Sequence, residues 1–120
     1  MIFHIAPAAA WEGARQVGTY RGDTLDTEGF IHCSTAVQVL PVANRLYRGR
    51  RDLVLLAIDP ARAGDVRYEE SEPGEQFPHL YGPLDVDAVT RFEPFLPAAD
   101  GAFREFPVLD EQFESRREIT

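Results

Sequence analysis

The chain has 120 residues and a formal net charge of −8 at pH 7, and 44% of its residues are hydrophobic. The length suits one domain with one core, and the composition is that of a globular protein. The acidic balance argues against broad nucleic-acid binding, because neutralising phosphates needs a basic surface. The basic cluster at 48–51 is typical of a solvated turn.

Cysteine usage and hydropathy bear on the compartment. The single cysteine, Cys33, excludes an internal disulfide and fits a reducing environment. The N-terminal segment has no basic region ahead of an apolar stretch and meets Pro7 early, unlike a signal peptide. The longest fully apolar run, 53–58, is far below membrane-spanning length. We therefore expect a soluble cytoplasmic protein without membrane contact.

The first third of the chain predicts a strand, a helix and a second strand. A short strand at 2–5 is followed by apolar residues at helical spacing, from Ala10 through Trp11 and Ala14 to Val17. Gly18 stands where a helix C-terminal glycine would. Trp11 is expected to anchor this helix in the core, with stacking on a ligand as the alternative. Residues 19–28 are predicted to form a loop, and Phe30–Cys33 a second strand.

The middle of the chain predicts a second helix. Thr35 and Gln38 have the spacing of a capping box, so this helix is expected to begin near Thr35 and end at Gly49. Pro41 should kink or restart it, because proline removes one backbone hydrogen bond.

The remainder is mostly extended. Residues 53–58 are apolar on both faces, which predicts a central strand, and the alternation at 66–69 predicts another. Residues 71–76 are expected to be a flexible loop, 77–83 a rigid extended segment, and 84–95 one strand or two short ones. The sequence thus predicts an α+β fold with two main helices: a single domain at 1–107 and a charged C-terminal tail at 108–120.

The chain has three histidines, His4, His32 and His79, and each lies in a strand-like segment beside aromatic residues. Each one alone could be a core histidine that bonds to the backbone. Together they suggest a pocket on which all three converge, with catalytic roles for the imidazoles. Three neutral imidazoles also make a catalytic zinc site, although their spacing matches no local ligand motif.

Strand alternation sorts the polar groups at 29–34. Neighbouring strand residues point to opposite faces, so Phe30, His32 and Ser34 should share one face while Cys33 packs into the core. This arrangement disfavours Cys33 as a nucleophile. An acid from the 69–75 segment could act as a general base or bind a ribose hydroxyl, and the candidates are Glu69, Glu70, Glu72 and Glu75.

The chain resembles an uncharacterised, mostly bacterial family, domain of unknown function 952. Two histidine motifs carry the resemblance, Gly29-Phe30-Ile31-His32-Cys33-Ser34 and Phe77-Pro78-His79-Leu80-Tyr81-Gly82-Pro83-Leu84. The segments 2–5, 19–20, 52–56 and 58–59 and Trp11 also match. The resemblance covers about 2–95. It implies a split β-sheet core like that of the ADP-ribosyltransferases, which bind NAD in a cleft.

The resemblance also implies roles for single residues. His4 is similar to the ribose-binding histidine of those enzymes, and His32 with Tyr20 and Phe30 would line the nicotinamide–ribose part of the pocket. The usual catalytic glutamate has no clear counterpart, since the third motif offers His79 and Tyr81. A related branch, the RNA 2′-phosphotransferases, also lacks it but holds RNA phosphate with basic residues, which this acidic chain does not favour.

Three hypotheses follow from these observations. The first is a group transferase with His4, His32 and His79 as catalytic residues and Tyr20, Phe30, Ser34 and Tyr81 as ligand-binding residues. NAD or an ADP-ribose-like nucleotide would be its ligand, and NAD the candidate cofactor. The second is a non-catalytic module that binds a nucleotide or small metabolite in the same pocket. The third is a three-histidine metal-dependent hydrolase.

Overall fold

The structure is a computed structural model that describes residues 1–107; the predicted charged tail, 108–120, lies outside the described residues. The helices are α1 (Ala8–Val17), α2 (Leu25–Glu28), α3 (Val39–Leu46) and α4 (Pro60–Ala63), with 3-10 turns η1 (Ala36–Gln38) and η2 (Val86–Ala88). The strands are β1 (Ile2–Pro7), β2 (Thr19–Tyr20), β3 (Ile31–His32), β4 (Leu53–Ile58), β5 (Asp65–Glu72), β6 (Glu75–Tyr81), β7 (Leu84–Asp85) and β8 (Val89–Phe95). The α+β class is confirmed, and α1 and α3 are the two main helices.

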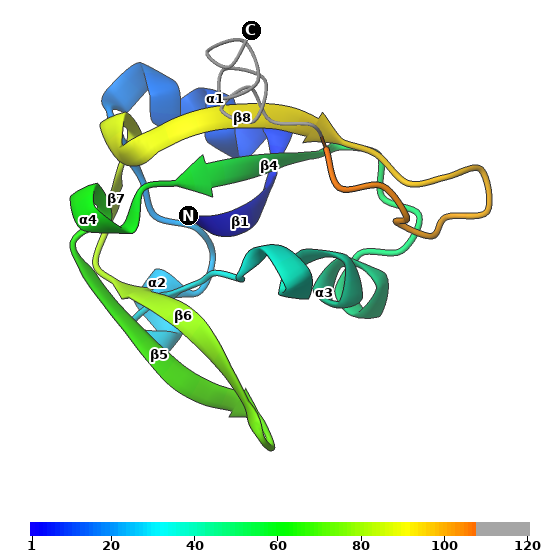
Figure 1. Cartoon of the computed structure of the whole chain (residues 1–120). Coiled ribbons are helices and arrows are strands. Elements are labelled where there is room, and N and C mark those ends of the chain that lie inside the picture. The colour runs from blue at the N-terminus through cyan, green and yellow to red at the C-terminus, as the bar shows by residue number, and fades with distance from the viewer. Residues whose placement is uncertain (108–120) are drawn as a thin grey trace, which may run out of the picture.

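The strands form separate antiparallel sheets, in the orders β1-β4-β8, β3-β6-β5 and β2-β7. Figure 1 shows β4 between β1 and β8, while the β5–β6 hairpin extends away from that sheet. The two three-stranded sheets meet at one backbone bridge, where Phe3 and Ser34 exchange two N–H···O bonds of 2.8 Å. This junction brings the middle of β1 next to the end of β3.

The core lies on both faces of the β1-β4-β8 sheet. One apolar cluster combines alternate residues of β1 and β4, such as Ile2 and Leu56, with Trp11 of α1 and the inner face of β3 and β6. The other cluster combines the opposite residues, such as Phe3 and Leu55, with α3. Every residue of β4 is therefore buried, which confirms the predicted central strand.

Local signals explain both main helices. Gly18 ends α1 with φ of +96° and donates its N–H to the Ala14 carbonyl at 2.7 Å. The predicted capping box is present, but it starts the 3-10 turn η1, and α3 begins only at Val39. Pro41 then lies in the first turn of α3, where N–H groups lack helical partners in any case. The predicted restart is thus confirmed, although α3 ends at Leu46 rather than at Gly49.

Two predicted loops were wrong in part. Residues 71–76 were expected to form a flexible loop, but β5 continues to Glu72, β6 begins at Glu75, and the two residues pair across a tight turn. Residues 19–28 contain the two-residue strand β2 and the single turn α2. The 84–95 segment is two strands, β7 and β8, separated by η2. Within 1–107, no helix has the length and apolar character needed to span a membrane.

Candidate functional site

His4 links three segments through its ring. It is carried by β1, its Nδ1 lies 2.6 Å from the carbonyl oxygen of His32, and its Nε2 lies 2.9 Å from the hydroxyl of Tyr20. A carbonyl only accepts, so Nδ1 donates, and neutral Nε2 must accept the Tyr20 O–H. Burial lowers the pKa of His4 and raises the pKa of Tyr20. Both side chains are therefore neutral at pH 7.

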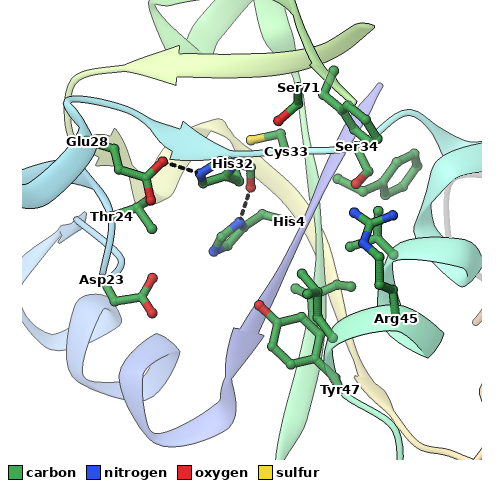
Figure 2. Close-up of a pocket in the computed structure, with 15 residues that line it drawn as sticks. His4, Asp23, Thr24, Glu28, His32, Cys33, Ser34, Arg45, Tyr47 and Ser71 are labelled. Carbon is green, nitrogen blue, oxygen red and sulfur yellow. Dashed lines mark hydrogen bonds and ion pairs between the residues drawn. The ribbon is translucent and has the colours of Figure 1, made fainter. Parts of the chain in front are cut away.

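Two neighbouring cavities flank His4. The one we call the His32 cavity has a volume of about 280 Å³ and includes His32 and Ser34 in its wall (Figure 2). The other, which we call the Tyr20 cavity, has a volume of about 460 Å³ and includes Tyr20. Both are lined by His4, Ile5, Asp23 and Tyr47. The volume of the Tyr20 cavity is within the range typical of small-molecule sites, and that of the His32 cavity is just below it.

The His32 cavity carries charges of both signs. Asp23 precedes α2, and Glu28 is its last residue; the Glu28 carboxylate lies 3.0 Å from Nε2 of His32. Arg45 comes from α3 and makes no hydrogen bond or ion pair with any residue in 1–107. In Figure 2 the two carboxylates lie on one side of the cavity and the guanidinium on the other. The cavity thus offers complementary ends to a polar ligand.

The 29–34 motif divides only in part as strand alternation predicted. His32 and Ser34 line the same cavity. Cys33 also borders that cavity, but it is 3% exposed and packs in an apolar core cluster. Burial raises the pKa of the Cys33 thiol to about 12, so it stays protonated and is a poor nucleophile. Phe30 does not line this cavity; its ring packs on His79 with centroids 4.1 Å apart.

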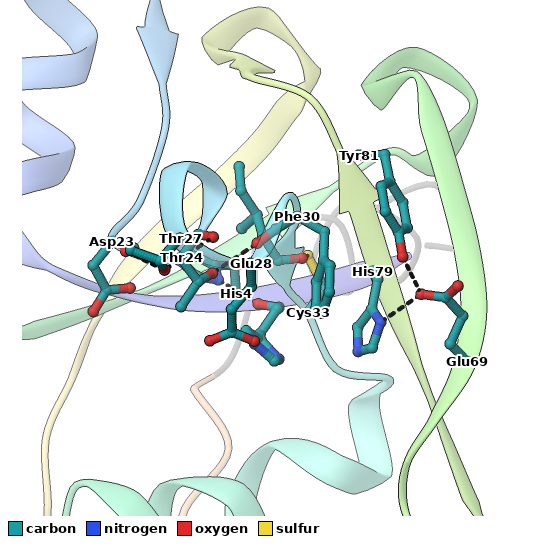
Figure 3. Close-up of polar contacts among 12 residues, drawn as sticks. His4, Asp23, Thr24, Thr27, Glu28, Phe30, Cys33, Glu69, His79 and Tyr81 are labelled. Atoms are coloured by element: carbon teal, nitrogen blue, oxygen red, sulfur yellow. Dashed lines mark hydrogen bonds and ion pairs between the residues drawn. The ribbon is translucent and has the colours of Figure 1, made fainter.

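His79 belongs to a second polar cluster on the same sheet face. It is 3% exposed, and its Nδ1 lies 2.8 Å from Oε1 of Glu69, which also accepts the Tyr81 O–H at 2.6 Å (Figure 3). The Tyr81 hydrogen bond, followed by that of His79, lowers the pKa of Glu69. The Glu69 carboxylate is therefore ionised at pH 7, so it only accepts and Nδ1 of His79 donates.

The three histidines lie in a row but do not share one pocket. His32 stands in the middle: its carbonyl accepts from His4, and its ring centroid is 5.2 Å from that of His79. His79 lines neither the His32 cavity nor the Tyr20 cavity. The predicted full convergence is thus wrong for His79 and holds for His4 and His32.

A three-histidine metal centre is also not formed. Both ring nitrogens of His4 are engaged by protein groups. Among residues 1–107 no three His, Cys, Asp or Glu side chains are grouped so that they could hold a metal ion. The metal-hydrolase hypothesis therefore has no ligand set in this part of the chain.

Sequence reasoning missed the charged groups of the cavity. It looked for an acid at 69–75, yet Glu69 binds His79, Glu75 lies 3.2 Å from Gln38, and none of the four candidates lines either cavity. The acids that do, Asp23 and Glu28, lie in the predicted loop just before Gly29. Their place directly ahead of the His32 motif was the available signal. Nothing in the local pattern marked Arg45 or Tyr47.

Comparison with known proteins agrees with the geometry of this fold. The sequence profile of the family described as "Protein of unknown function (DUF952)" matches residues 5–92. The chain belongs to this family. It is similar to the crystal structure of protein CC0527 from Caulobacter crescentus, with 39% identity and a TM-score of 0.79 over 86% of this chain and 92% of that one.

Two further structures of CC0527 have a similar identity and TM-score to this chain. The crystal structure of a variant with two methionine substitutions has 38% identity and a TM-score of 0.78 over 86% of this chain and 92% of that one. The solution NMR structure has 39% identity and a TM-score of 0.75 over 86% and 90% of the two chains. Among curated proteins, none matches. The family and the fold are thereby established.

Proposed function

We propose that the His32 and Tyr20 cavities bind a small anionic ligand that carries hydroxyl groups, of the nucleotide class to which NAD and ADP-ribose belong. The observation that carries this proposal is the placement of Arg45 opposite Asp23 and Glu28 in one cavity. Guanidinium groups favour phosphate, and carboxylates accept hydrogen bonds from ribose hydroxyls. The shared wall allows a ligand to extend from one cavity into the other.

Group transfer at the anomeric ribose carbon is the chemistry that this site suits best. The bond from that carbon to nicotinamide breaks, and its electron pair leaves with nicotinamide. An acceptor hydroxyl, or water, forms the new bond, and its proton passes to the Glu28–His32 pair. A nearby carboxylate stabilises an oxocarbenium-like centre, as in glycoside hydrolysis, and Glu28 supplies the carboxylate that the sequence reading lacked. We include in this proposal the fold resemblance to the ADP-ribosyltransferases that the sequence suggested.

A specific observation also favours the second candidate, a non-catalytic binding module. Both nitrogens of His4 are held by protein groups, so a ribose contact through this ring requires the Tyr20 O–H to release Nε2. If Tyr20 keeps its hydrogen bond to Nε2, His4 forms part of the pocket wall and positions the ligand without taking part in a reaction. The two candidates share the ligand and differ in turnover.

Binding is tested by calorimetric titration of NAD and ADP-ribose into the wild type and into Arg45→Gln. A charged hydrogen bond contributes about 1.5–3 kcal/mol, so we expect the variant to bind about 10–100-fold more weakly. Arg48→Gln is the matched control: it removes the same charge from a nearby exposed residue that lines neither cavity. No wild-type binding at millimolar ligand, or an equal loss in the control, would contradict the proposal.

Turnover separates the two candidates. Nicotinamide released from NAD is measured by chromatography for the wild type, Glu28→Gln and His32→Ala. If the Glu28–His32 pair takes part in group transfer, we expect Glu28→Gln to reduce the rate of nicotinamide release by roughly 10²–10⁴-fold. The variant should still bind ADP-ribose. Binding without nicotinamide release by the wild type would assign the protein to the binding-module class.

A further inference from the structure

A ring nitrogen that lies outside the two proposed cavities is buried and has no hydrogen-bond partner in the described region. Nε2 of His79 is buried and makes no hydrogen bond within residues 1–107. Nδ1 donates to Glu69, and in the tautomer with its proton on Nδ1 the ring presents a lone pair at Nε2. The Tyr81 hydroxyl holds the Glu69 carboxylate in place, and this opposes a flip of the His79 imidazole. A buried acceptor without a partner lowers stability, so each case calls for an explanation.

The ring of Phe30 fills a slot between aromatic side chains beside this acceptor. It stacks on His79 at 4.1 Å and 17°, and its centroid lies 4.8 Å from that of His32 and 5.3 Å from that of Tyr81. Phe30 is only half-buried and follows Gly29, whose φ of +91° places a left-handed turn next to it. Figure 3 shows the phenyl ring standing next to the His79 imidazole. The ring could therefore move outward without disturbing either core cluster.

We propose that Phe30 is a gate, and that a planar heterocycle with an N–H donor takes its slot and donates to Nε2 of His79. The inference rests on the proposed function, since nucleotides carry such a ring or a ring amide. His32 connects the proposed ligand cavity to the Phe30 slot, because it lines the His32 cavity and its ring contacts both Phe30 and His79. The heterocycle would stack on imidazole as Phe30 does now, and its N–H group would supply the missing partner.

Phe30→Ala tests the gate, with nicotinamide and adenine as probes in calorimetric titrations. Removing the phenyl ring leaves the slot open, so we expect at least one of the two probes to bind about tenfold more tightly than to the wild type. His79→Phe in the Phe30→Ala background keeps an aromatic ring but removes the acceptor, and should abolish the gain. Phe92→Ala is the control, because this exposed ring contacts Trp11 and Arg15 instead.

A second measurement avoids any change at the buried histidine. In Phe30→Ala, nitrogen NMR of the His79 side chain should show a shift of Nε2 when the probe is added, while Nδ1 keeps its proton. No gain for either probe in Phe30→Ala, or a gain that survives His79→Phe, would overturn the gate. Failure of the nucleotide proposal has a different signature: ADP-ribose would not bind the wild type, whatever the free heterocycles do in Phe30→Ala.

Discussion

His4 shows how one side chain acquires a fixed tautomer from its neighbours. Its two hydrogen bonds run in a defined direction, from the Tyr20 O–H to Nε2 and from Nδ1–H to the His32 carbonyl. Protonating Nε2 would break the first of these, because the phenol would then face an N–H group. Burial outweighs the backbone hydrogen bond and lowers the pKa of His4 below its ordinary value of 6.5.

This shift predicts a pH dependence of stability. In the unfolded chain His4 titrates near its ordinary pKa of about 6.5. Between the lowered folded pKa and 6.5, the unfolded state binds a proton that the folded state does not, so the free energy of unfolding rises with pH in that window. We expect stability to fall as the pH is lowered from 7 through 6.5, with a slope of at most about 1.4 kcal/mol per pH unit from this group.

Urea unfolding of the wild type and His4→Gln at several pH values isolates the contribution. The other two histidines are present in both proteins, so the difference between the two slopes reports His4. Equal slopes above pH 5 would show that His4 does not titrate abnormally in the folded state.

Gln38 connects elements that are distant in the chain. Its Oε1 accepts the Thr35 N–H at 2.9 Å, and its Nε2 donates to the Gln76 carbonyl at 2.8 Å and to Glu75 at 3.2 Å. One side chain thus caps the turn before α3 and attaches the β5–β6 hairpin to it. Ser71 and Phe77 of that hairpin line the His32 cavity, so this attachment also shapes the candidate site.

Gln38→Glu is expected to break the attachment. A carboxylate cannot donate to the Gln76 carbonyl, and it would repel Glu75. We expect the free energy of unfolding to fall by about 1–3 kcal/mol at pH 7, measured by urea denaturation. Gln16→Glu on the exposed side of α1 makes the same chemical change and should stay within about 0.5 kcal/mol of the wild type. A similar loss in both variants would mean that added charge, rather than the lost hydrogen bond, is responsible.

The elements that could be predicted from sequence are those with strong local signals. β4 is apolar on both faces, Gly18 ends α1, and Trp11 is buried as expected. The β5–β6 turn was missed, because an acidic segment with Gly and Pro is typical of a loop whether or not its ends pair. β2 has two residues, too few for any periodicity to show.

At the scale of the whole molecule, the site depends on contacts that local patterns do not encode. The 29–34 motif predicted which face His32 and Ser34 share, because that follows from alternation alone. Which histidine meets which cavity depends instead on strand register: His32 lies opposite His79 on β6, while β1 brings His4 to the other side of β3. Arg45 and Glu28 line one cavity from two different helices, and nothing in its local pattern marked Arg45.

The division into two three-stranded sheets predicts unequal local stability. β4 is buried along its whole length and pairs on both sides, whereas β5 is an edge strand without a fully buried residue. Polar contacts between the sheets include the Phe3–Ser34 bridge and the hydrogen bond from His4 to the His32 carbonyl. Opening of β5 therefore exposes far less apolar surface than opening of β4.

Native-state hydrogen exchange measures this difference. Amides of β4 should exchange only through global unfolding, and those of β5 through a smaller opening whose free energy is lower by at least about 2 kcal/mol. Because the hairpin forms one wall of the His32 cavity, a ligand that bridges the hairpin and α3 should slow exchange in β5 and β6 more than in β4. Equal opening free energies for β4 and β5 would show that the two sheets unfold as one unit, and the cavity between them would then be rigid.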